Sequence, residues 1–287
     1  MSETTAPDET TAPDEKTAPG GEIVRIWARG VAPETRVGGQ RGRLSDDDIA
    51  DAYSVGDRAV PWLRVNFVSS LDGAATVKGL SGGLSDAADH RVFDVLRRLC
   101  DVVIVGAGTA RAEGYGPMRL DDRQISWRRA HGLADHPPFA LVSAALGLDP
   151  ADRIFAHAPV RPIVVTTQRA PADRKKALAE VADVLECGEL TVDPRLMRDA
   201  LAKRGLAQQH CEGGPHLFGS LIAADSVDEL CLTESPKIVA GSGPRISGGN
   251  APEMPVALSL EHILRSGSTL LLRYVRDERQ AASAAIE

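Results

Sequence analysis

The chain has 287 residues, which is enough for one large domain or two small ones around a buried core. With 43% hydrophobic and 25% charged residues, its composition is typical of a soluble globular protein. The formal net charge of -7 argues against a general nucleic-acid-binding protein, although local arginine clusters are compatible with a pocket for a small anion.

The sequence shows no sign of a membrane span, a secretion signal or a metal centre. No apolar run approaches the ~20 residues that a spanning helix needs, and the first residues lack a basic and then apolar pattern. The cysteines form no C-x-x-C pair and have no histidine at ligand spacing, so we expect mostly buried thiols and no metal site. The cytoplasm is the expected compartment.

The first sixty residues divide into a tail and an extension. Residues 1–22 repeat Thr-Ala-Pro-Asp-Glu and hold almost nothing for a core, so we expect a disordered acidic tail. Residues 23–60 are mixed, and Ser45 with the acids that follow it predicts a helix that runs to about Tyr53. We interpret residues 23–60 as an extension packed on a main domain of residues 61–276. Residues 277–287 are then a C-terminal tail.

The main domain opens with a predicted strand, a loop and a helix. Residues 62–68 form an apolar run that ends at the turn signal Asp72-Gly73. After a glycine-rich loop over residues 78–83, Ser85 is the expected cap of an amphipathic helix. The apolar face of this helix comprises Val92, Phe93, Leu96 and Leu99.

Strands and helices then alternate along the chain. Residues 101–105 are rich in β-branched side chains, as in a strand covered on both faces of a parallel sheet, and a loop at residues 106–109 is expected to follow. We interpret the polar residues 119–138 as a loop or a short helix. Further strands are predicted at residues 139–142, 163–166, 181–185 and 206–211, and helices at residues 172–180, 194–203 and 215–223. This alternation implies a layered α/β domain with a mainly parallel sheet.

The C-terminal part has a different pattern. Strands are predicted at residues 227–233, 238–240, 258–264 and 269–275, with no helix of comparable length between them. We therefore expect this part to add antiparallel strands at an edge of the sheet.

The most informative stretch is a predicted strand, turn and helix around Glu212. Gly213 and Gly214 remove the Cβ atoms that would keep a ligand away, and Pro215 suits a first helical position. Such a turn directs free N–H groups and the positive end of a helix dipole at one spot, so a phosphate or pyrophosphate fits there. A tight connection without a ligand is the alternative. Because a carboxylate is a poor phosphate neighbour, we expect Glu212 to point toward a donor-rich substrate.

Four segments in a fixed order carry a family resemblance. They are residues 65–73 (VNFVSSLDG), 105–109 (VGAGT), 212–215 (EGGP) and 228–237 (DELCLTESPK). Together they resemble the reductase domain of the bacterial riboflavin-pathway deaminase/reductase family, over roughly residues 61–276. The resemblance implies a dihydrofolate-reductase-like three-layer α/β/α fold with antiparallel C-terminal edge strands. The H-x-E and P-C-x-x-C motifs of the family's deaminase half do not occur, so the chain looks like a stand-alone reductase.

The resemblance also implies an activity and a set of roles. The reaction would be the NADPH-dependent reduction of 5-amino-6-(5-phosphoribosylamino)uracil to the ribitylamino compound, with the hydride passing to the sugar C1′. The implied cofactor contacts are Val68, Thr109, Glu113, Ser143, Thr166, Gly213, Gly214, Pro215, His216, Leu217, Phe218 and Gly219. The implied substrate contacts are Ser81, Arg97, Arg119 and Glu212. For Arg97 alone, a solvated helix residue is the alternative.

Glu113 is our candidate for the catalytic residue, because it could organise the nicotinamide end or relay a proton. Asp72 is the second choice, and its simpler role is to cap the turn that it forms with Gly73. The family commonly has an aspartate at position 113 and a tryptophan at position 83, where this chain has Gly83. The lost tryptophan removes a wall of the site.

Two alternatives stay open. The missing tryptophan makes a dihydrofolate-reductase-like activity on a pterin worth testing, and a degenerate substrate site would point to a non-catalytic NADPH-binding protein. The presence of Ser81, Arg97 and Glu212 together argues against the second. The expected partners are a phosphorylated pyrimidine and, from the resemblance and the C-terminal edge strands, a second copy in a homodimer. No nucleic acid and no membrane are expected as partners.

Overall fold

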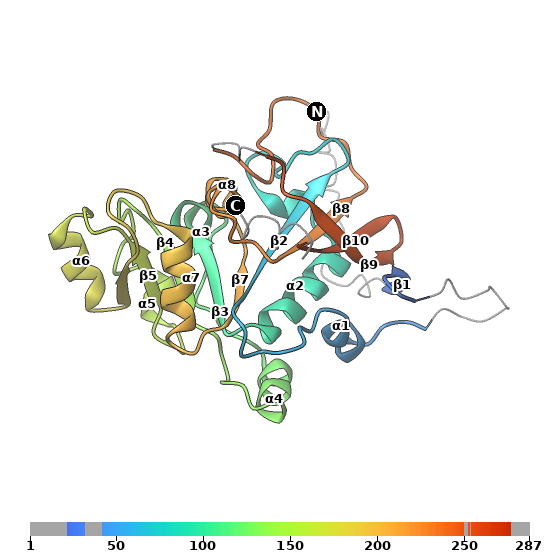
Figure 1. The fold of residues 1–287 in the computed structure, drawn as a ribbon, viewed down its shortest axis with the longest axis horizontal. Coiled ribbons are helices and arrows are strands. Elements are labelled where there is room, and N and C mark those ends of the chain that lie inside the picture. Colours follow the sequence, from blue (N-terminus) through green and yellow to red (C-terminus); the bar gives the residue numbers. More distant parts are fainter. Residues whose placement is uncertain (1–21, 32–41, 250–251, 253, 277–287) are drawn as a thin grey trace, which may run out of the picture.

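One ten-stranded sheet organises the chain in the computed structural model (Figure 1). The structure describes residues 22–31, 42–249, 252 and 254–276, so nearly all of the predicted N-terminal tail and the whole C-terminal tail lie outside the described residues. The strand order is β1-β9-β10-β8-β2-β7-β3-β4-β5-β6. The strands are β1 Val24–Ala28, β2 Trp62–Ser70, β3 Val102–Gly106, β4 Phe139–Val142, β5 Ile163–Thr166, β6 Asp183–Glu186, β7 Gln208–Cys211, β8 Glu229–Ser235, β9 Leu258–Ser266 and β10 Thr269–Arg276.

The sheet is mainly parallel, with antiparallel strands at one edge, which confirms the predicted fold class. The strands from β8 through β2, β7, β3, β4 and β5 to β6 all run parallel to their neighbours. Strand β10 pairs antiparallel with β8, β9 with β10, and β1 with β9. Strand β1 was not predicted, and it ties the N-terminal extension to the edge of the sheet.

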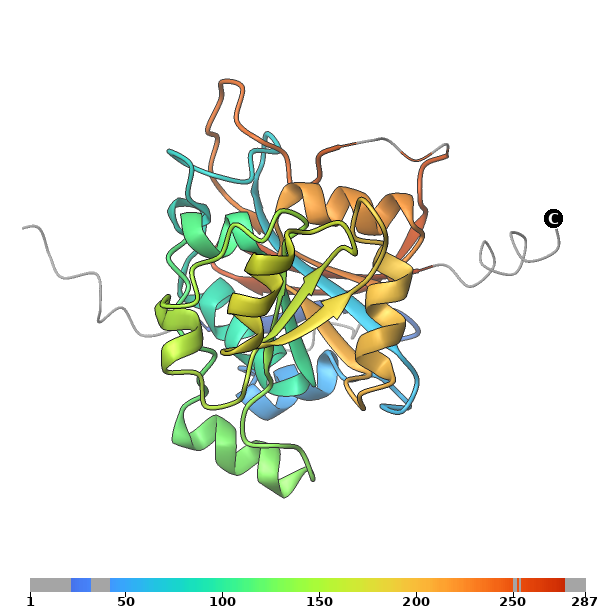
Figure 2. The same cartoon turned by 90° about the vertical axis from the view of Figure 1, so that its left-hand side faces the viewer.

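Helices cover both faces of the parallel part of the sheet (Figure 2). They are α1 Asp46–Ala52, α2 Ala87–Leu99, α3 Ala107–Ala112, α4 Asp122–Ala130, α5 Arg153–Ala156, α6 Ala172–Ala179, α7 Pro194–Ala202 and α8 Pro215–Ala223. In β3, Val102 and Ile104 pack in the core cluster of α7 and α8, whereas Val103 and Val105 pack in the cluster on the opposite face. Strand β3 is therefore buried on both sides, as its β-branched sequence predicts.

Two predicted segments are wrong because tertiary contacts override the local pattern. Residues 106–109 do not form a loop: Gly106 donates its N–H to the Gly213 carbonyl at 2.9 Å, and α3 begins at once at Ala107. Residues 238–240 form no strand, because the N–H groups of Val239 and Ala240 donate to the Asp72 carboxylate rather than to a neighbouring strand.

The helix start at Ser85 is wrong by one residue. Asp86 is the cap of α2, since its carboxylate accepts from the N–H groups of Ala88 and Asp89 at 2.9 Å each. Ser45 does cap α1, and the polar residues 119–138 contain α4. The other predicted elements lie within two residues of their expected bounds.

A buried charge network joins the extension to the sheet. The Glu229 side chain is fully buried, and its carboxylate accepts from Arg64 Nε at 2.7 Å and Arg273 Nε at 2.9 Å. The two guanidinium groups also donate to the carbonyls of Tyr53 and Ala52, at the end of α1. Burial alone would raise the pKa of Glu229, but the two arginines lower it to about 2. These contacts hold α1 against strands β2, β8 and β10.

We expect Glu229→Gln to lower the free energy of unfolding by about 3–5 kcal/mol at pH 7, because it leaves two buried arginines without a counter-charge. The measurement is urea denaturation followed by circular dichroism. Since the folded-state pKa is depressed, the stabilisation is present above the ordinary glutamate pKa of ~4.3. It should be lost as the pH falls toward about 2. Glu261→Gln, which removes a more exposed pair with Arg29, is the control. Equal urea midpoints for the two variants would contradict this account.

Candidate active site

The carboxyl ends of strands β2, β3, β4 and β7 border two adjoining cavities. The front cavity, of about 560 Å³, lies between α2, α3 and the end of β2. The side cavity, of about 500 Å³, lies between the start of α8, α3 and the end of β4. Thr109, Gly214 and Pro215 line both cavities. Ligands of open α/β sheets bind at this edge, so the two cavities form the candidate active site.

The turn between β7 and α8 separates the two cavities. Gly213 and Gly214 have positive φ angles of 104° and 65°, which favour glycine. A Cβ at Gly214 would lie 2.7 Å from Thr109 Oγ1, and one at Gly213 would lie 2.9 Å from the Phe67 ring. The backbone of the turn thus comes close to α3 because Gly214 has no side chain, and close to the Phe67 ring of β2 because Gly213 has none.

The start of α8 fits the expected anionic group of a dinucleotide. His216 and Leu217 line the side cavity, and first-turn N–H groups have no partner within their own helix. The bare backbone of the preceding turn leaves room for a ligand to approach these groups. The residues present therefore fit the predicted pyrophosphate site, with the diphosphate expected in the side cavity.

The front cavity contains a buried ion pair between two of the predicted substrate contacts. Arg97 donates from Nε and Nη2 to the two oxygens of Glu212, at 2.5 and 2.7 Å. The Glu212 side chain is fully buried, and the guanidinium of Arg97 lies 4.3 Å from the centre of the Phe93 ring. Burial alone would lower the pKa of Arg97, but Glu212 raises it. Arg97 is therefore not a solvated helix residue.

Glu113 and Ser81 meet across the mouth of the front cavity. Glu113 follows α3, and its Oε1 accepts the N–H of Ser81 at 2.8 Å. Both residues line the cavity, as does Val68 at the end of β2. The carboxylate of Glu113 thus fixes the glycine-rich loop beside the pocket.

Gly83 does not open the pocket. A Cβ at this position would lie 2.7 Å from the Cβ of Val77, so Val77 already fills the space beside the backbone. A tryptophan here would require the loop around residues 77–83 to move. The side chain of Val77 therefore occupies the space that a larger residue at position 83 would need. Gly83 itself is not part of the cavity lining.

Two other predicted contacts lie away from both cavities, and a third lies beside one of them. Arg119 is exposed and donates to the His157 carbonyl at 3.1 Å. Thr166 is fully buried at the end of β5, with its hydroxyl 3.5 Å from the Ala144 carbonyl. Ser143 stands between two residues that line the side cavity.

Two predicted cofactor contacts belong to the helix packing of α8. Phe218 is buried and its ring stacks on that of Phe67, with the ring centres 5.0 Å apart. Gly219 faces the backbone of Gly248 so closely that a Cβ would lie 1.8 Å from its carbonyl oxygen. These residues bring α8 against its neighbours.

Asp72, the second candidate for the catalytic residue, forms hydrogen bonds with a loop and does not face the candidate site. Its carboxylate accepts from the Ser70 hydroxyl and from the N–H groups of Val239 and Ala240. These hydrogen bonds lower the pKa of Asp72 to about 2. Asp72 lines neither cavity and anchors the loop that follows β8.

The structure adds residues to the front cavity that sequence reasoning missed. Asp89 and Phe93 line it from the same face of α2 as Arg97, at a spacing of four residues. Once Arg97 is identified as a site residue, this spacing predicts that Phe93 and Asp89 lie on the same face of the helix. Pro244 reaches the cavity from a distant loop, where its carbonyl accepts the Ala75 N–H at 2.8 Å. No local pattern indicates that contact.

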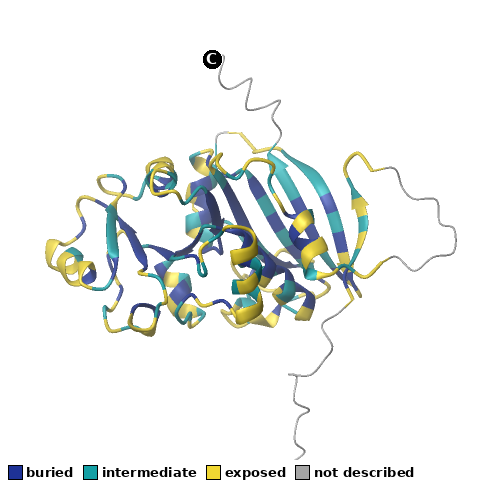
Figure 3. Cartoon of the chain, turned by 90° about the horizontal axis from the view of Figure 1, so that it is seen from below, coloured by how far each residue is buried: buried dark blue, intermediate teal, exposed yellow. Residues whose placement is uncertain are grey.

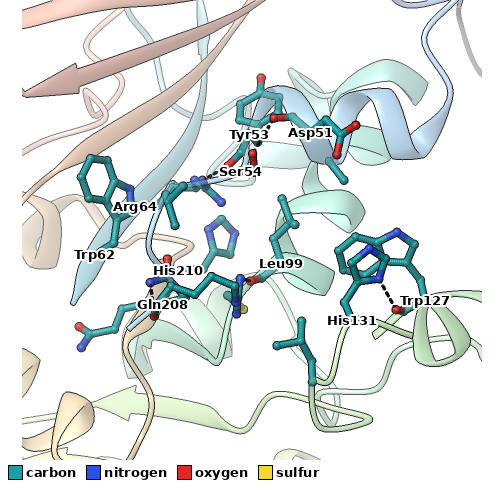
Figure 4. Close-up of a pocket in the computed structure, with 16 residues that line it drawn as sticks. Asp51, Tyr53, Ser54, Trp62, Arg64, Leu99, Trp127, His131, Gln208 and His210 are labelled. Carbon is teal, nitrogen blue, oxygen red and sulfur yellow. Dashed lines mark hydrogen bonds between the residues drawn. The ribbon is translucent and has the colours of Figure 1, made fainter. Parts of the chain in front are cut away.

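A smaller back cavity, of about 190 Å³, lies at the amino ends of β2 and β7 (Figure 4). His210 lines it, and neither ring nitrogen of this buried side chain has a hydrogen-bond partner in the described part of the chain. Burial lowers the pKa of His210 to about 4, so the ring is neutral at pH 7. Its Nε2 lies 3.7 Å from Glu212 Oε1. His210 therefore stands in the sheet between the back and front cavities.

The described residues contain neither a helix suited to span a membrane nor a cluster of side chains suited to hold a metal ion. Within residues 22–31, 42–249, 252 and 254–276, no helix has the length and apolar character needed to cross a membrane. The same ranges contain no group of three or more histidine, cysteine, aspartate or glutamate side chains that could hold a metal ion. All four cysteines are free and buried.

Comparisons with known proteins agree with this geometry. The family model described as RibD C-terminal domain matches residues 61–272. A curated relative is the 2,5-diamino-6-ribosylamino-4(3H)-pyrimidinone 5′-phosphate reductase of Methanothermobacter thermautotrophicus. It is 27% identical over 219 residues, which cover 75% of this chain and 97% of the relative.

Two solved structures share the fold. A pyrimidine reductase-like protein from Corynebacterium diphtheriae superposes with a TM-score of 0.70 at 29% identity, over 76% of this chain and 92% of that one. The diaminohydroxyphosphoribosylaminopyrimidine deaminase/5-amino-6-(5-phosphoribosylamino)uracil reductase from Thermotoga maritima gives 0.57 at 20% identity. That match covers 76% of this chain and 57% of the other and concerns the fold alone.

We expect Arg97→Met to lower the free energy of unfolding by about 3–5 kcal/mol at pH 7, because the buried Glu212 carboxylate loses its counter-charge. The double variant Arg97→Met/Glu212→Gln should regain much of this loss in urea denaturation. Arg129→Met removes a bidentate pair with Asp135 on the exposed surface and should change little. A double variant no more stable than Arg97→Met would show that the pair is not what stabilises this region.

Proposed function

Since the chain belongs to the RibD C-terminal domain family, we propose that it is a reductase of riboflavin biosynthesis. Its substrate is a 6-(5-phosphoribosylamino)pyrimidine, and its product carries a ribitylamino group in place of the ribosylamino group. The observation that carries this proposal is the pair of adjoining cavities that meet at the turn of Gly213 and Gly214. One suits a dinucleotide and the other a polar heterocycle.

We infer that the cofactor is NADPH, which supplies a hydride when it is bound. The bare turn and the first-turn N–H groups of His216 and Leu217 would bind the diphosphate. Thr109 and Val68, which line the front cavity, would contact the nicotinamide end. Ser143 follows β4 and Thr166 is the last residue of the neighbouring strand β5, and both would lie toward the other end of the cofactor.

The front cavity would hold the substrate. A hydride added to C1′ of the open-chain imine, with a proton added to the adjoining nitrogen, converts the carbon–nitrogen double bond into a single bond. Most of the rate in such a transfer comes from placement of the two reacting carbons. Ser81, Arg97 and Glu212 would orient the substrate, and Glu113 at the cavity mouth would hold or relay the proton. Arg119 follows the lining residue Pro117 by two positions and is a candidate for the phosphate.

A pterin reductase and a non-catalytic NADPH-binding protein were the alternatives to this function. The first depends on the missing tryptophan at Gly83, where Val77 fills the space, and the second on a degenerate substrate site, against which the presence of Ser81, Arg97 and Glu212 counts. The relatives described above are reductases of riboflavin biosynthesis or resemble them, and they lend no support to either alternative.

We also infer that two copies associate through the open face of the antiparallel strands. In the described part of the chain, helices α1 and α2 lie on one face of β8, β10 and β9, and no helix covers the other (Figure 3). That face carries Leu232, Leu272 and Ile263 side by side across the three strands; Leu232 and Ile263 are half-buried, and Leu272 between them is 8% exposed. Apolar residues in a row on an open sheet face favour association. Sedimentation equilibrium should therefore give twice the chain mass of 30.4 kDa.

The test of this function incubates the purified chain with NADPH and one of two substrates. They are 2,5-diamino-6-ribosylamino-4(3H)-pyrimidinone 5′-phosphate and 5-amino-6-(5-phosphoribosylamino)uracil. We expect loss of the nicotinamide absorbance and, by mass spectrometry, a product two hydrogens heavier. Dihydropterins are the control substrates. Oxidation of NADPH with a pterin but with neither pyrimidine would overturn the proposal.

We predict that Glu113→Gln reduces kcat by about 100-fold while NADPH affinity changes far less, because the amide cannot hold or relay the proton. The amide oxygen can still accept the Ser81 N–H, so the loop should remain in position. Steady-state kinetics and NADPH titration by fluorescence measure the two effects. Glu180→Gln, an exposed residue after α6, is the matched control. Equal losses in turnover and affinity would remove Glu113 from the chemistry.

A further inference from the structure

Asp89 is a buried carboxylate without a partner in the front cavity. Its relative exposure is 7%, and it lines the cavity from α2, in line with Phe93 and Arg97. Its backbone N–H donates to the Asp86 cap, but its carboxylate has no hydrogen bond or ion pair among the described residues. The carboxylate lines the cavity without a partner in the described part of the chain, so a ligand that carries hydrogen-bond donors fits beside it.

No cation of the cavity wall is free to supply that partner. Arg97 is the one arginine or lysine among the lining residues that the structure describes, and both oxygens of Glu212 already engage it. Arg97 also lies eight residues from Asp89, or about 12 Å along the helix axis. Glu113 uses an oxygen for the Ser81 N–H. Asp89 therefore has no free arginine or lysine beside it among the described lining residues, and its carboxylate is available as an acceptor for a ligand.

This arrangement selects the part of the substrate that binds there. A phosphate dianion beside Asp89 would be repelled, so a neutral group with hydrogen-bond donors fits this end of the cavity. A 2-amino-4-pyrimidinone carries an amino group on C2 and an N–H at N3 side by side, which match the two oxygens of a carboxylate. A uracil has a carbonyl oxygen on C2 instead. Its lone pairs would face the carboxylate, and no donor would replace the lost hydrogen bond.

We propose that Asp89 is a specificity-determining residue that accepts hydrogen bonds from the C2 amino group and N3–H of a 2,5-diamino-6-ribosylamino-4(3H)-pyrimidinone 5′-phosphate. The inference rests on the proposed function and deepens it, because it selects the amino-bearing substrate over the uracil. The reduction then comes before any hydrolytic deamination at C2. A site that hydrogen-bonds to a donor of its substrate discriminates strongly against an analogue without that donor. A site that recognises shape alone discriminates less.

The test compares kcat/KM for the two pyrimidine substrates in the wild-type chain, in Asp89→Asn and in Asp94→Asn. Wild type should prefer the diamino substrate by about 10- to 100-fold, the range for a charged hydrogen bond. Asp89→Asn should lose most of this preference, mainly through a higher KM for the diamino substrate, and should keep or gain activity on the uracil. Asp94 is exposed on the same helix and lies outside the cavity lining, so its variant should keep the wild-type preference.

Two other outcomes separate this inference from the function on which it rests. If the wild-type chain oxidises NADPH with neither pyrimidine, the proposed function fails and takes the inference with it. If it is active but Asp89→Asn keeps the wild-type preference, or loses equal activity on both substrates, only the role of Asp89 is overturned. The NADPH affinity and the thermal midpoint of each variant show whether Asp89→Asn is folded. Asp89→Glu keeps the charge, so it provides a second folded variant and should retain the preference for the diamino substrate.

Discussion

The candidate site depends on the close approach of two backbone segments, the end of β3 and the turn between β7 and α8. Gly106 donates its N–H to the carbonyl of Gly213, and the bare Cα of Gly214 lies against the Thr109 hydroxyl. This contact brings the starts of α3 and α8 together at the carboxyl edge of the sheet. Both cavities use it as a shared wall. A side chain at Gly214 would push the turn away from Thr109 of α3, and one at Gly213 would push it away from the Phe67 ring of β2.

The second organising feature is the way charge is buried along β2 and β7. Arg64 and His210 are neighbours across these two strands and point to the same face of the sheet. Arg64 is neutralised by Glu229 near the amino end, while His210 stays uncharged at pH 7 because burial lowers its pKa to about 4. Glu212, two residues after His210, is paired with Arg97. Arg64 and Arg273 share Glu229, whereas Asp89 on the facing helix has no ion pair among the described residues.

Much of the fold could be predicted because its determinants are local. The apolar run of β3 has alternate residues in two different cores, which requires a covered parallel strand. Ser45 and Asp193 cap helices where such residues usually do. Predictions failed where distant groups compete for the backbone. Val239 and Ala240 look like part of a strand, but the Asp72 carboxylate, far away in sequence, binds their N–H groups.

In the candidate site, too, local features could be predicted from sequence and contacts between distant residues could not. The family-like positions Arg97 and Glu212 could be named from sequence, but their mutual ion pair could not, because it joins α2 to the end of β7 across more than a hundred residues. In the sequence, Asp89 is one of several acids at a helix start, where such residues are common. Only the packing of α2 shows that it faces a cavity and has no partner.

The loop that carries Pro244 connects β8 to β9, whose outer surfaces form the open sheet face. Pro244 lines the front cavity, and the loop is held by hydrogen bonds to Ala75 and, through Gly248, to the Pro215 carbonyl at the start of α8. If a second copy covered the open face, it would contact the strands at both ends of this loop. Its dissociation would then leave the loop less restrained and would speed the exchange of ligands in the front cavity.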